Sequence, residues 1–225
     1  MTEKILLSWS GGKDSALSLH ELRKTGQFEI TALVTTVTEG YDRISMHGVR
    51  RTLLEQQAAS AGIALEQIVI SQKASNQEYE MMMQTLLERY LRLGVTKVAF
   101  GDLFLEDIRK YRDENLARIG MTGLYPLWRR DTTAMAHEFI SLGFRAVICC
   151  VDSKALDGKF VGRDFDAQLI GELPSTVDPC GENGEFHSFV CDGPIFQYRV
   201  PVTKGEISLR DGRFWYCDLI PGEIG

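Results

Sequence analysis

The stretch Ser8-Trp9-Ser10-Gly11-Gly12-Lys13-Asp14-Ser15 separates a short apolar run from a helical pattern. Residues 4–7 before it are typical of a buried parallel strand, and apolar residues at positions 16, 17, 19 and 22 share one face of a helix. The loop is therefore expected between a first strand and a first helix, where open α/β sheets bind ligands. Two glycines, a helix N-terminus, two serine hydroxyls and the lysine together predict a phosphate site.

Two common phosphate loops do not fit this stretch. A P-loop NTPase needs glycine where Leu7 stands and Ser or Thr where Asp14 stands, and a dinucleotide fingerprint needs glycine in place of Lys13. Residues 10–15 instead match in full the Ser-Gly-Gly-x-Asp-Ser motif, and so resemble the pyrophosphate loop of N-type ATP pyrophosphatases. Enzymes similar in this motif cleave ATP between the α- and β-phosphates and activate a substrate as its adenylate.

Composition limits the classes of function. The chain has 225 residues and a formal charge of −6, which argues against general nucleic-acid binding. No apolar run approaches the ~20 residues of a membrane span, and no signal-peptide pattern opens the chain, so a cytoplasmic protein is expected. The five cysteines are an odd number without a C-x-x-C pair, which argues against a disulfide framework. Cys180, His187 and Cys191 have spacings that match no usual zinc site.

Strand and helix patterns alternate through the first two thirds of the chain. Strands are expected over 29–37, 65–70, 95–102 and 145–151, and helices over 49–61, 75–92, 106–119 and 132–142. A capping box at Ser75 and Glu78 opens the second of these helices, and Thr132 is expected to cap the last. Beyond residue 151 a short helix is expected over 163–169 and a hairpin around Asp211-Gly212.

These patterns predict an α/β fold with an open, mainly parallel, doubly wound sheet, followed by a smaller C-terminal α+β region. The boundary is expected near residues 130 to 150. We take residues 1–135 as an ATP-binding domain and residues 136–225 as a substrate-recognition domain.

Two further segments carry candidate chemistry. Gly101 and Asp102 end a strand, where a glycine and a carboxylate fit a ligand site, although a turn residue or helix cap is the plainer interpretation of the carboxylate. Residues 178–189 are polar and glycine-rich, and their acidic residues and His187 could bind an amine or move a proton. An exposed connection with a surface histidine is the plainer alternative, and from composition the two are about even.

Three blocks of sequence together resemble the diphthine–ammonia ligase family. The blocks are residues 10–15, residues 101–128 with Gly101-Asp102 and Leu124-Tyr125-Pro126-Leu127-Trp128, and residues 178–194. The resemblance implies an adenine-nucleotide α-hydrolase-like (HUP) domain and a family-specific C-terminal domain. Similar proteins convert a carboxylate to an amide with ATP and ammonium, releasing AMP and pyrophosphate. Their known acceptor is diphthine on translation elongation factor 2.

The resemblance implies roles for particular residues. The expected nucleotide-binding residues are Ser8, Ser10, Gly11, Gly12, Lys13, Asp14, Ser15, Val34, Thr35, His47 and Gly101. Asp14 would also hold Mg²⁺ beside the phosphates, because a carboxylate next to phosphates needs an intervening cation. The residues expected to act in catalysis are Asp14, Asp102, Glu182, Asn183, Glu185 and His187. All except Asp14 are expected to face the acceptor and ammonia.

Other functions stay open at this point. The chain could be an adenine-nucleotide-binding module without catalysis, or an ATP pyrophosphatase acting on a different acceptor. A sulfur-transferring or nucleic-acid-modifying enzyme usually needs a reactive cysteine pair or a basic surface, and neither is evident. A separate glutaminase domain does not fit this length, so free ammonium is the simpler nitrogen source. The sequence leaves the oligomeric state open, a homodimer included.

Overall fold

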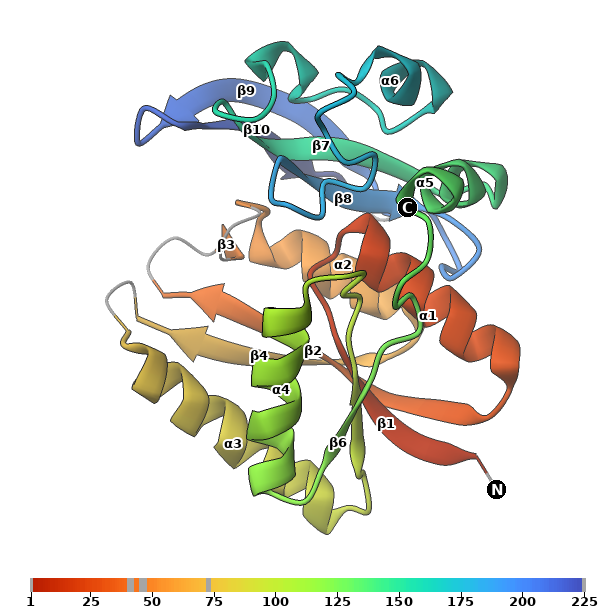
Figure 1. Ribbon diagram of the computed structural model, residues 1–225, viewed down its shortest axis with the longest axis vertical. Coiled ribbons are helices and arrows are strands. Elements are labelled where there is room, and N and C mark those ends of the chain that lie inside the picture. The colour runs from red at the N-terminus through yellow and green to blue at the C-terminus, as the bar shows by residue number, and fades with distance from the viewer. Residues whose placement is uncertain (1, 40–42, 45–47, 72–73, 224–225) are drawn as a thin grey trace.

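The computed structural model describes residues 2–39, 43–44, 48–71 and 74–223, which form two β-sheets with helices between them (Figure 1). The parallel strands of the first sheet are β1 (Glu3–Ser8), β2 (Phe28–Thr38), β4 (Ala64–Ile70), β5 (Lys97–Ala99) and β6 (Thr122–Leu124). β1 lies in the centre, between β2 and β5, and the short β3 (Arg43–Ile44) pairs antiparallel with the end of β2. The centre of a parallel sheet is buried on both faces, as the apolar run of β1 predicts.

Helices cover both faces of this sheet. α1 (Lys13–Thr25) and α2 (Arg51–Ala61) lie on one face, and α3 (Asn76–Arg92) and α4 (Glu106–Arg118) lie on the other (Figure 1). Successive side chains of a strand point to opposite faces, and β1 follows this rule. Ile5 and Leu7 join the core that contains α1 and α2, whereas Leu6 joins the core under α3 and α4. The expected doubly wound sheet is confirmed.

Local sequence signals fix several boundaries. The capping box at Ser75 and Glu78 is present and opens α3 as predicted. The expected strand over 95–102 is shorter, so Gly101 and Asp102 lie beyond the end of β5. The sequence pattern does not predict β6, because three residues are too few to show an alternation.

Two helix starts in the C-terminal part differ from the prediction. α5 (Thr132–Ser141) is capped by Asp131, whose side chain accepts a hydrogen bond from the backbone N–H of Ala134, instead of by Thr132. α6 (Ala167–Glu172) begins after Asp166, which caps it in the same way, and not at residue 163. In both cases an aspartate carboxylate binds the helix N-terminus.

The second sheet is antiparallel, with strand order β8–β7–β10–β9. Its strands are β7 (Arg145–Asp152), β8 (Phe186–Asp192), β9 (Val202–Arg210) and β10 (Phe214–Pro221), and a 3-10 turn, η1 (Gly158–Phe160), follows β7. The expected hairpin joins β9 to β10, and Asp211 and Gly212 both adopt the left-handed backbone conformation of such turns. The smaller α+β region expected at the C-terminus is thereby confirmed.

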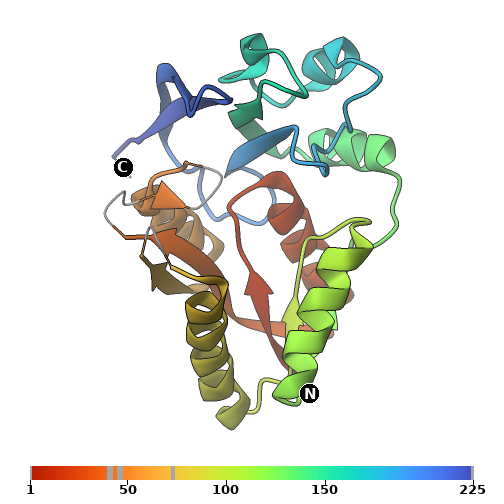
Figure 2. The same ribbon diagram turned by 60° about the vertical axis from the view of Figure 1, so that its left-hand side comes forward.

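α1 and α2 lie between the two sheets, as Figures 1 and 2 show from two directions. One hydrophobic core joins Leu53 and Leu54 of α2 to Phe189 and Val190 of β8. We propose that the two expected domains correspond to the two sheets with their helices, although the division at residue 135 falls within α5. In the described residues, no helix is long and apolar enough to cross a membrane.

Candidate active site

The pyrophosphate loop, residues 10–15, follows the end of β1 and leads into α1. The hydroxyl oxygens of Ser10 and Ser15 lie 3.3 Å apart, and the backbone N–H of Gly12 donates to Ser10 Oγ at 3.2 Å. Ser15 Oγ donates to the carbonyl of Gly12 at 2.9 Å. The two serines therefore hold a tight turn at the start of a helix, where the helix dipole favours an anion.

Gly11 is fixed by residues that are distant in the sequence. Its φ is +76°, and a Cβ there would lie 2.6 Å from Leu54 Cδ2 and 2.7 Å from Gln57 Oε1. The carbonyl of Gly11 accepts hydrogen bonds from Gln57 Nε2 at 3.0 Å and from the backbone N–H of Val190 in β8 at 2.9 Å. Only glycine fits this backbone conformation and this space. The two hydrogen bonds to its carbonyl show that α2 and the C-terminal sheet together hold the loop.

Lys13 and Asp14 form a buried ion pair at the start of α1. Lys13 Nζ lies 2.8 Å from both carboxylate oxygens of Asp14, and only 4% of Lys13 is exposed. Burial opposes the charge on Lys13, but the Asp14 carboxylate outweighs it and raises the pKa of Lys13. The backbone N–H of Lys13 donates to Ser188 Oγ at 3.2 Å, so this N–H group is already bound by β8.

The C-terminal half of β2 and the residues that follow β5 border the same space. Val34 and Thr35 of β2 are buried beside the loop. Gly101 packs so closely that a Cβ there would lie 3.0 Å from the backbone carbon of Asp14, which explains a glycine at this strand end. Asp102 is paired with Arg112 of α4, whose Nε lies 2.8 Å from Asp102 Oδ2.

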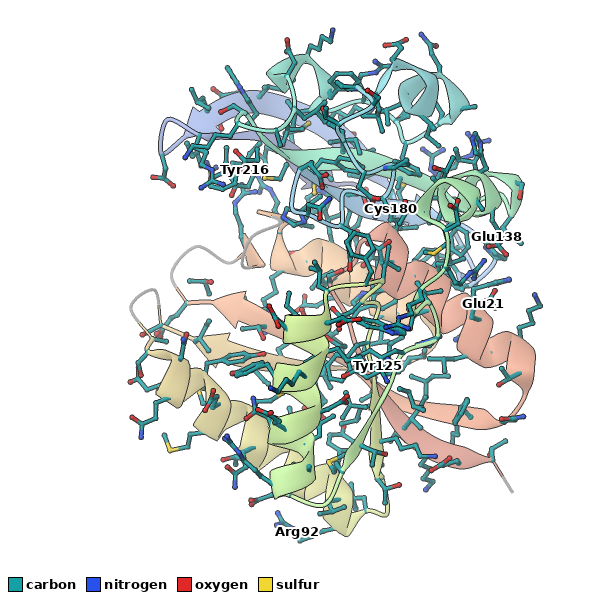
Figure 3. All side chains as sticks on the ribbon, viewed as in Figure 1. Glu21, Arg92, Tyr125, Glu138, Cys180 and Tyr216 are labelled. Carbon is teal, nitrogen blue, oxygen red and sulfur yellow. The ribbon has the colours of Figure 1, made fainter. Side chains whose placement is uncertain are left out.

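The segment 178–185 approaches the loop from the C-terminal part. Cys180, labelled in Figure 3, lies at the level between the two sheets. The Glu185 carboxylate accepts hydrogen bonds from the backbone N–H groups of Asp178 and Asn183 and from the Asn183 side-chain amide. Only 4% of Glu185 is exposed, so this carboxylate holds its own segment in shape.

Glu182 of this segment and His187 of β8 both line the space above the loop. Glu182 Oε1 accepts a hydrogen bond from the backbone N–H of Leu103 at 2.8 Å, just past the end of β5. Burial raises the pKa of Glu182 to about 7. Burial also lowers the pKa of His187 to about 4, with nearby Lys13 acting in the same direction. His187 is therefore neutral at pH 7.

One cavity of about 470 Å³ joins these groups. The expected site residues that line it are Ser8, Ser10, Gly12, Lys13, Asp14, Ser15, Val34, Thr35, Gly101, Asp102, Glu182 and His187. Gly11 lies behind the loop, and Asn183 and Glu185 lie within their own segment, so these three do not line the cavity. Asn183 and Glu185 were expected to face the acceptor, but neither residue lines this cavity. His47 falls outside the described residues.

Sequence reasoning missed Arg112 and Ser188. Arg112 belongs to the charged helix α4, where it lines the cavity and stacks on Phe100, with its guanidinium carbon 4.3 Å from the ring centre. No residue pattern in α4 distinguishes Arg112 from Arg109 or Lys110, so nothing in the sequence alone identifies it.

A second, apolar hollow of about 120 Å³ adjoins the cavity between α3 and α4. It shares Ser8, Val34, Tyr79, Met83 and Arg112 with the cavity, and Phe100 and Leu87 extend it under the helices. A flat apolar group attached to a phosphate chain could therefore occupy both spaces at once. Among the described residues, no three His, Cys, Asp or Glu side chains gather in a way that could hold a metal ion without other ligands.

Two family models and several named relatives match this chain. The model of the diphthamide synthase N-terminal domain matches residues 3–123, and that of the diphthamide synthase C-terminal domain matches residues 131–219. Relatives named diphthine–ammonia ligase include those of Homo sapiens, at 26% identity over 88% of this chain and 82% of the relative, and of Danio rerio, at 27% over 88% and 85%. The Schizosaccharomyces pombe relative is 27% identical over 91% of this chain, which spans only 37% of that longer protein.

Among solved structures, a tRNA thiolase of Methanococcus maripaludis matches with a TM-score of 0.38 and 15% identity, over 63% of this chain and 58% of that one. The family models and the named relatives confirm the family that the three sequence blocks indicated and favour an ATP-dependent amide ligase over a binding module. The two models together match most of the chain, which therefore belongs to the diphthamide synthase family.

Proposed function

We propose that this protein uses ATP to adenylate a carboxylate and then transfers ammonia to it, giving an amide, AMP and pyrophosphate. The observation that supports this best is the shared cavity, in which the complete pyrophosphate loop faces Glu182 and His187 from the C-terminal part. Because its relatives are named diphthine–ammonia ligase, we propose diphthine on translation elongation factor 2 as the acceptor. A reaction on that factor would take place in the cytoplasm.

ATP would lie across the tips of the central strands. Its phosphates would bind at residues 10–15, where the positive end of the α1 dipole and the charge of Lys13 favour an anion. Its adenine would enter the apolar hollow between α3 and α4, against Val34, Met83 and Phe100. Gly101 lets the chain after β5 pack against the backbone of Asp14 at the start of α1, which keeps this part of the site beside the phosphate loop.

Asp14 fits a magnesium ion that is bound mainly by phosphates. Mg²⁺ is usually held by one or two carboxylates together with substrate phosphates and water, so a single carboxylate beside the loop is a suitable donor. Asp14 lines the cavity and is kept in place by Lys13. When bound, the ion would neutralise charge on the phosphates. Lys13 would then be free to lend its charge to the departing pyrophosphate, because Asp14 would have a second cation.

The two chemical steps use different sides of the cavity. In the first, an oxygen of the acceptor carboxylate attacks the α-phosphorus, and pyrophosphate leaves toward residues 10–15. In the second, ammonia attacks the acyl carbon and AMP leaves. Positioning and charge stabilisation would provide most of the catalysis. The Cys180 thiol is not ionised at neutral pH, because burial raises its pKa to about 12.

The products of nucleotide turnover test this proposal. The purified protein is incubated with ATP, Mg²⁺, ammonium and elongation factor 2 that carries diphthine, and the nucleotides are separated by chromatography. We expect AMP and pyrophosphate in equal amounts, formed only when the acceptor is present, and an amide on the acceptor by mass spectrometry. ADP and phosphate as main products would contradict the proposed reaction, and AMP formation with another carboxylate only would contradict the acceptor.

A further inference from the structure

We propose that Glu182 accepts a proton from the incoming ammonium ion and so produces the ammonia that attacks the acyl adenylate. This inference rests on the proposed function. It assigns the base of the second step, which the fold and the family match leave open. Its basis is the arrangement of the acidic side chains in the cavity.

Three acidic side chains line the cavity, and two of them are paired with cations. Lys13 binds both carboxylate oxygens of Asp14, and Arg112 binds Asp102 through Nε at 2.8 Å. In the part of the chain that the structure describes, Glu182 has no such ion pair, and the hydrogen bond to its carboxylate comes from the backbone N–H of Leu103 to Oε1. Its Oε2 is therefore the carboxylate oxygen best placed to receive a cation or a proton.

Glu182 is held firmly enough to act as a base. Its backbone N–H donates to Asp178 Oδ1 at 3.3 Å, and Glu185 binds the backbone on either side of it. The bond from Leu103 then fixes the carboxylate itself, across the junction between the two parts of the chain. A base whose backbone and one oxygen are both fixed presents the other oxygen in one direction, as proton transfer requires.

The surroundings of Glu182 suit this role. Burial, the largest cause, raises its pKa to about 7, and Asp14 and Asp102 add to this effect while the Leu103 N–H and Lys13 oppose it. A carboxylate with this pKa is partly ionised at neutral pH and is a stronger base than an ordinary glutamate. His187 is less suitable, because burial and Lys13 lower its pKa to about 4.

The step balances as follows. Ammonium transfers one proton to Glu182, which becomes a neutral carboxylic acid, and leaves ammonia with a free electron pair. That pair forms the bond to the acyl carbon, and the bond from this carbon to the phosphate oxygen breaks with its electrons on AMP. The nitrogen then loses a second proton to water, and Glu182 returns its own proton to solvent before the next turnover.

Hydroxylamine separates this role from a structural one, because it is largely neutral at pH 7 and attacks acyl adenylates without prior loss of a proton. For Glu182→Gln with diphthine-bearing elongation factor 2, we expect amide formation from ammonium to fall at least ~100-fold. Hydroxamate formation from hydroxylamine should stay within about threefold of the wild type. The exposed Asp107 on α4 provides a matched control, and Asp107→Asn should leave both rates unchanged. Equal loss of both products in Glu182→Gln, or loss of neither, would overturn the assignment.

The pH dependence gives a second measurement. In the wild type, amide formation should rise as the pH increases through about 7, where Glu182 loses its proton, and this rise should be absent in Glu182→Gln. A rise that persists unchanged in the variant would assign the titration to another group and overturn the proposal.

A cation probe tests whether the Glu182 carboxylate binds an ammonium-like ion, even if diphthine is not the acceptor. Thallium(I) resembles ammonium in size and charge, and crystals soaked in thallium acetate should show an anomalous peak at the Glu182 carboxylate. The peak should be missing in Glu182→Gln and present in Asp107→Asn. A wild-type crystal without thallium at Glu182 would contradict the proposal. Failure of the proposed function would instead appear as wild-type protein that forms no AMP with the acceptor.

Discussion

Replacement of Gln57 by leucine should weaken both the fold and the binding of ATP. The Gln57 side chain is fully buried and makes three hydrogen bonds, to the indole N–H of Trp9 at 3.0 Å and to the carbonyls of Gly11 and Val190 at 3.0 and 2.6 Å. Leucine has a similar volume, so the cost comes from lost hydrogen bonds more than from a cavity. At about 1 kcal/mol for each bond, the free energy of unfolding should fall by about 3 kcal/mol.

Urea denaturation and ATP titration measure the two effects. With a slope of about 3 kcal/mol per molar urea, the unfolding midpoint should fall by about 1 M. ATP affinity should fall at least ~10-fold, since Gly11 loses one of the two groups that hold its carbonyl. In the described part of the chain, the side chain of the neighbouring Gln56 donates one hydrogen bond, to the carbonyl of Gly222, and Gln56→Leu should cost at most about 1 kcal/mol. The reasoning would be refuted by a Gln57→Leu variant whose free energy of unfolding lies within about 0.5 kcal/mol of the wild type. It would also be refuted if that variant were destabilised but bound ATP normally.

Other variants test the remaining contacts. Gly101→Ala should raise the KM for ATP at least ~10-fold in steady-state assays, because its Cβ would press on the backbone of Asp14. Asp14→Asn should abolish AMP formation in a protein that circular dichroism shows to be folded. Glu185→Gln should lower the free energy of unfolding by about 1–3 kcal/mol, since one of the N–H groups now bound would face an amide N–H₂. A hydrogen bond from Arg50 lowers the pKa of Asp218, so the stability that Asp218 contributes is present at neutral pH and lost as the pH falls through its folded-state pKa. Asp218→Asn should therefore be less stable than the wild type at pH 7 but not in strong acid, as measured by thermal unfolding.

The architecture could be predicted because its signals are local and repeated. Apolar runs, glycine helix ends such as Gly26 and the capping box at Ser75 each depend on a few neighbouring residues. β6 and the cap at Asp131 were missed for different reasons. A three-residue strand exists only because β5 lies beside it, and Asp131 and Thr132 are adjacent residues that can both cap a helix.

The site was predictable only in part, because the sequence gives residue types without directions. Glu182 and Glu185 lie three positions apart in one glycine-rich segment, and composition does not distinguish them. Their roles separate in space: the Glu185 carboxylate binds the backbone of its own segment, whereas Glu182 crosses to Leu103 and enters the cavity. A contact between positions 79 residues apart cannot be inferred from local pattern, and neither can the bond from the Lys13 N–H to Ser188.

The cross-contacts argue against treating the two matched domains as independent functional units. The phosphate loop is formed by N-terminal residues, but its Gly11 carbonyl and Lys13 N–H are both bound by β8 of the C-terminal sheet. In the opposite direction, the backbone of Leu103 in the N-terminal part orients Glu182 of the C-terminal part. Each part of the chain therefore fixes, by hydrogen bonds, the position of functional groups that belong to the other part. In the proposed mechanism, ATP activation and ammonia transfer both use groups that the two parts hold together. The geometry of the loop depends on β8 being in place even before an acceptor binds.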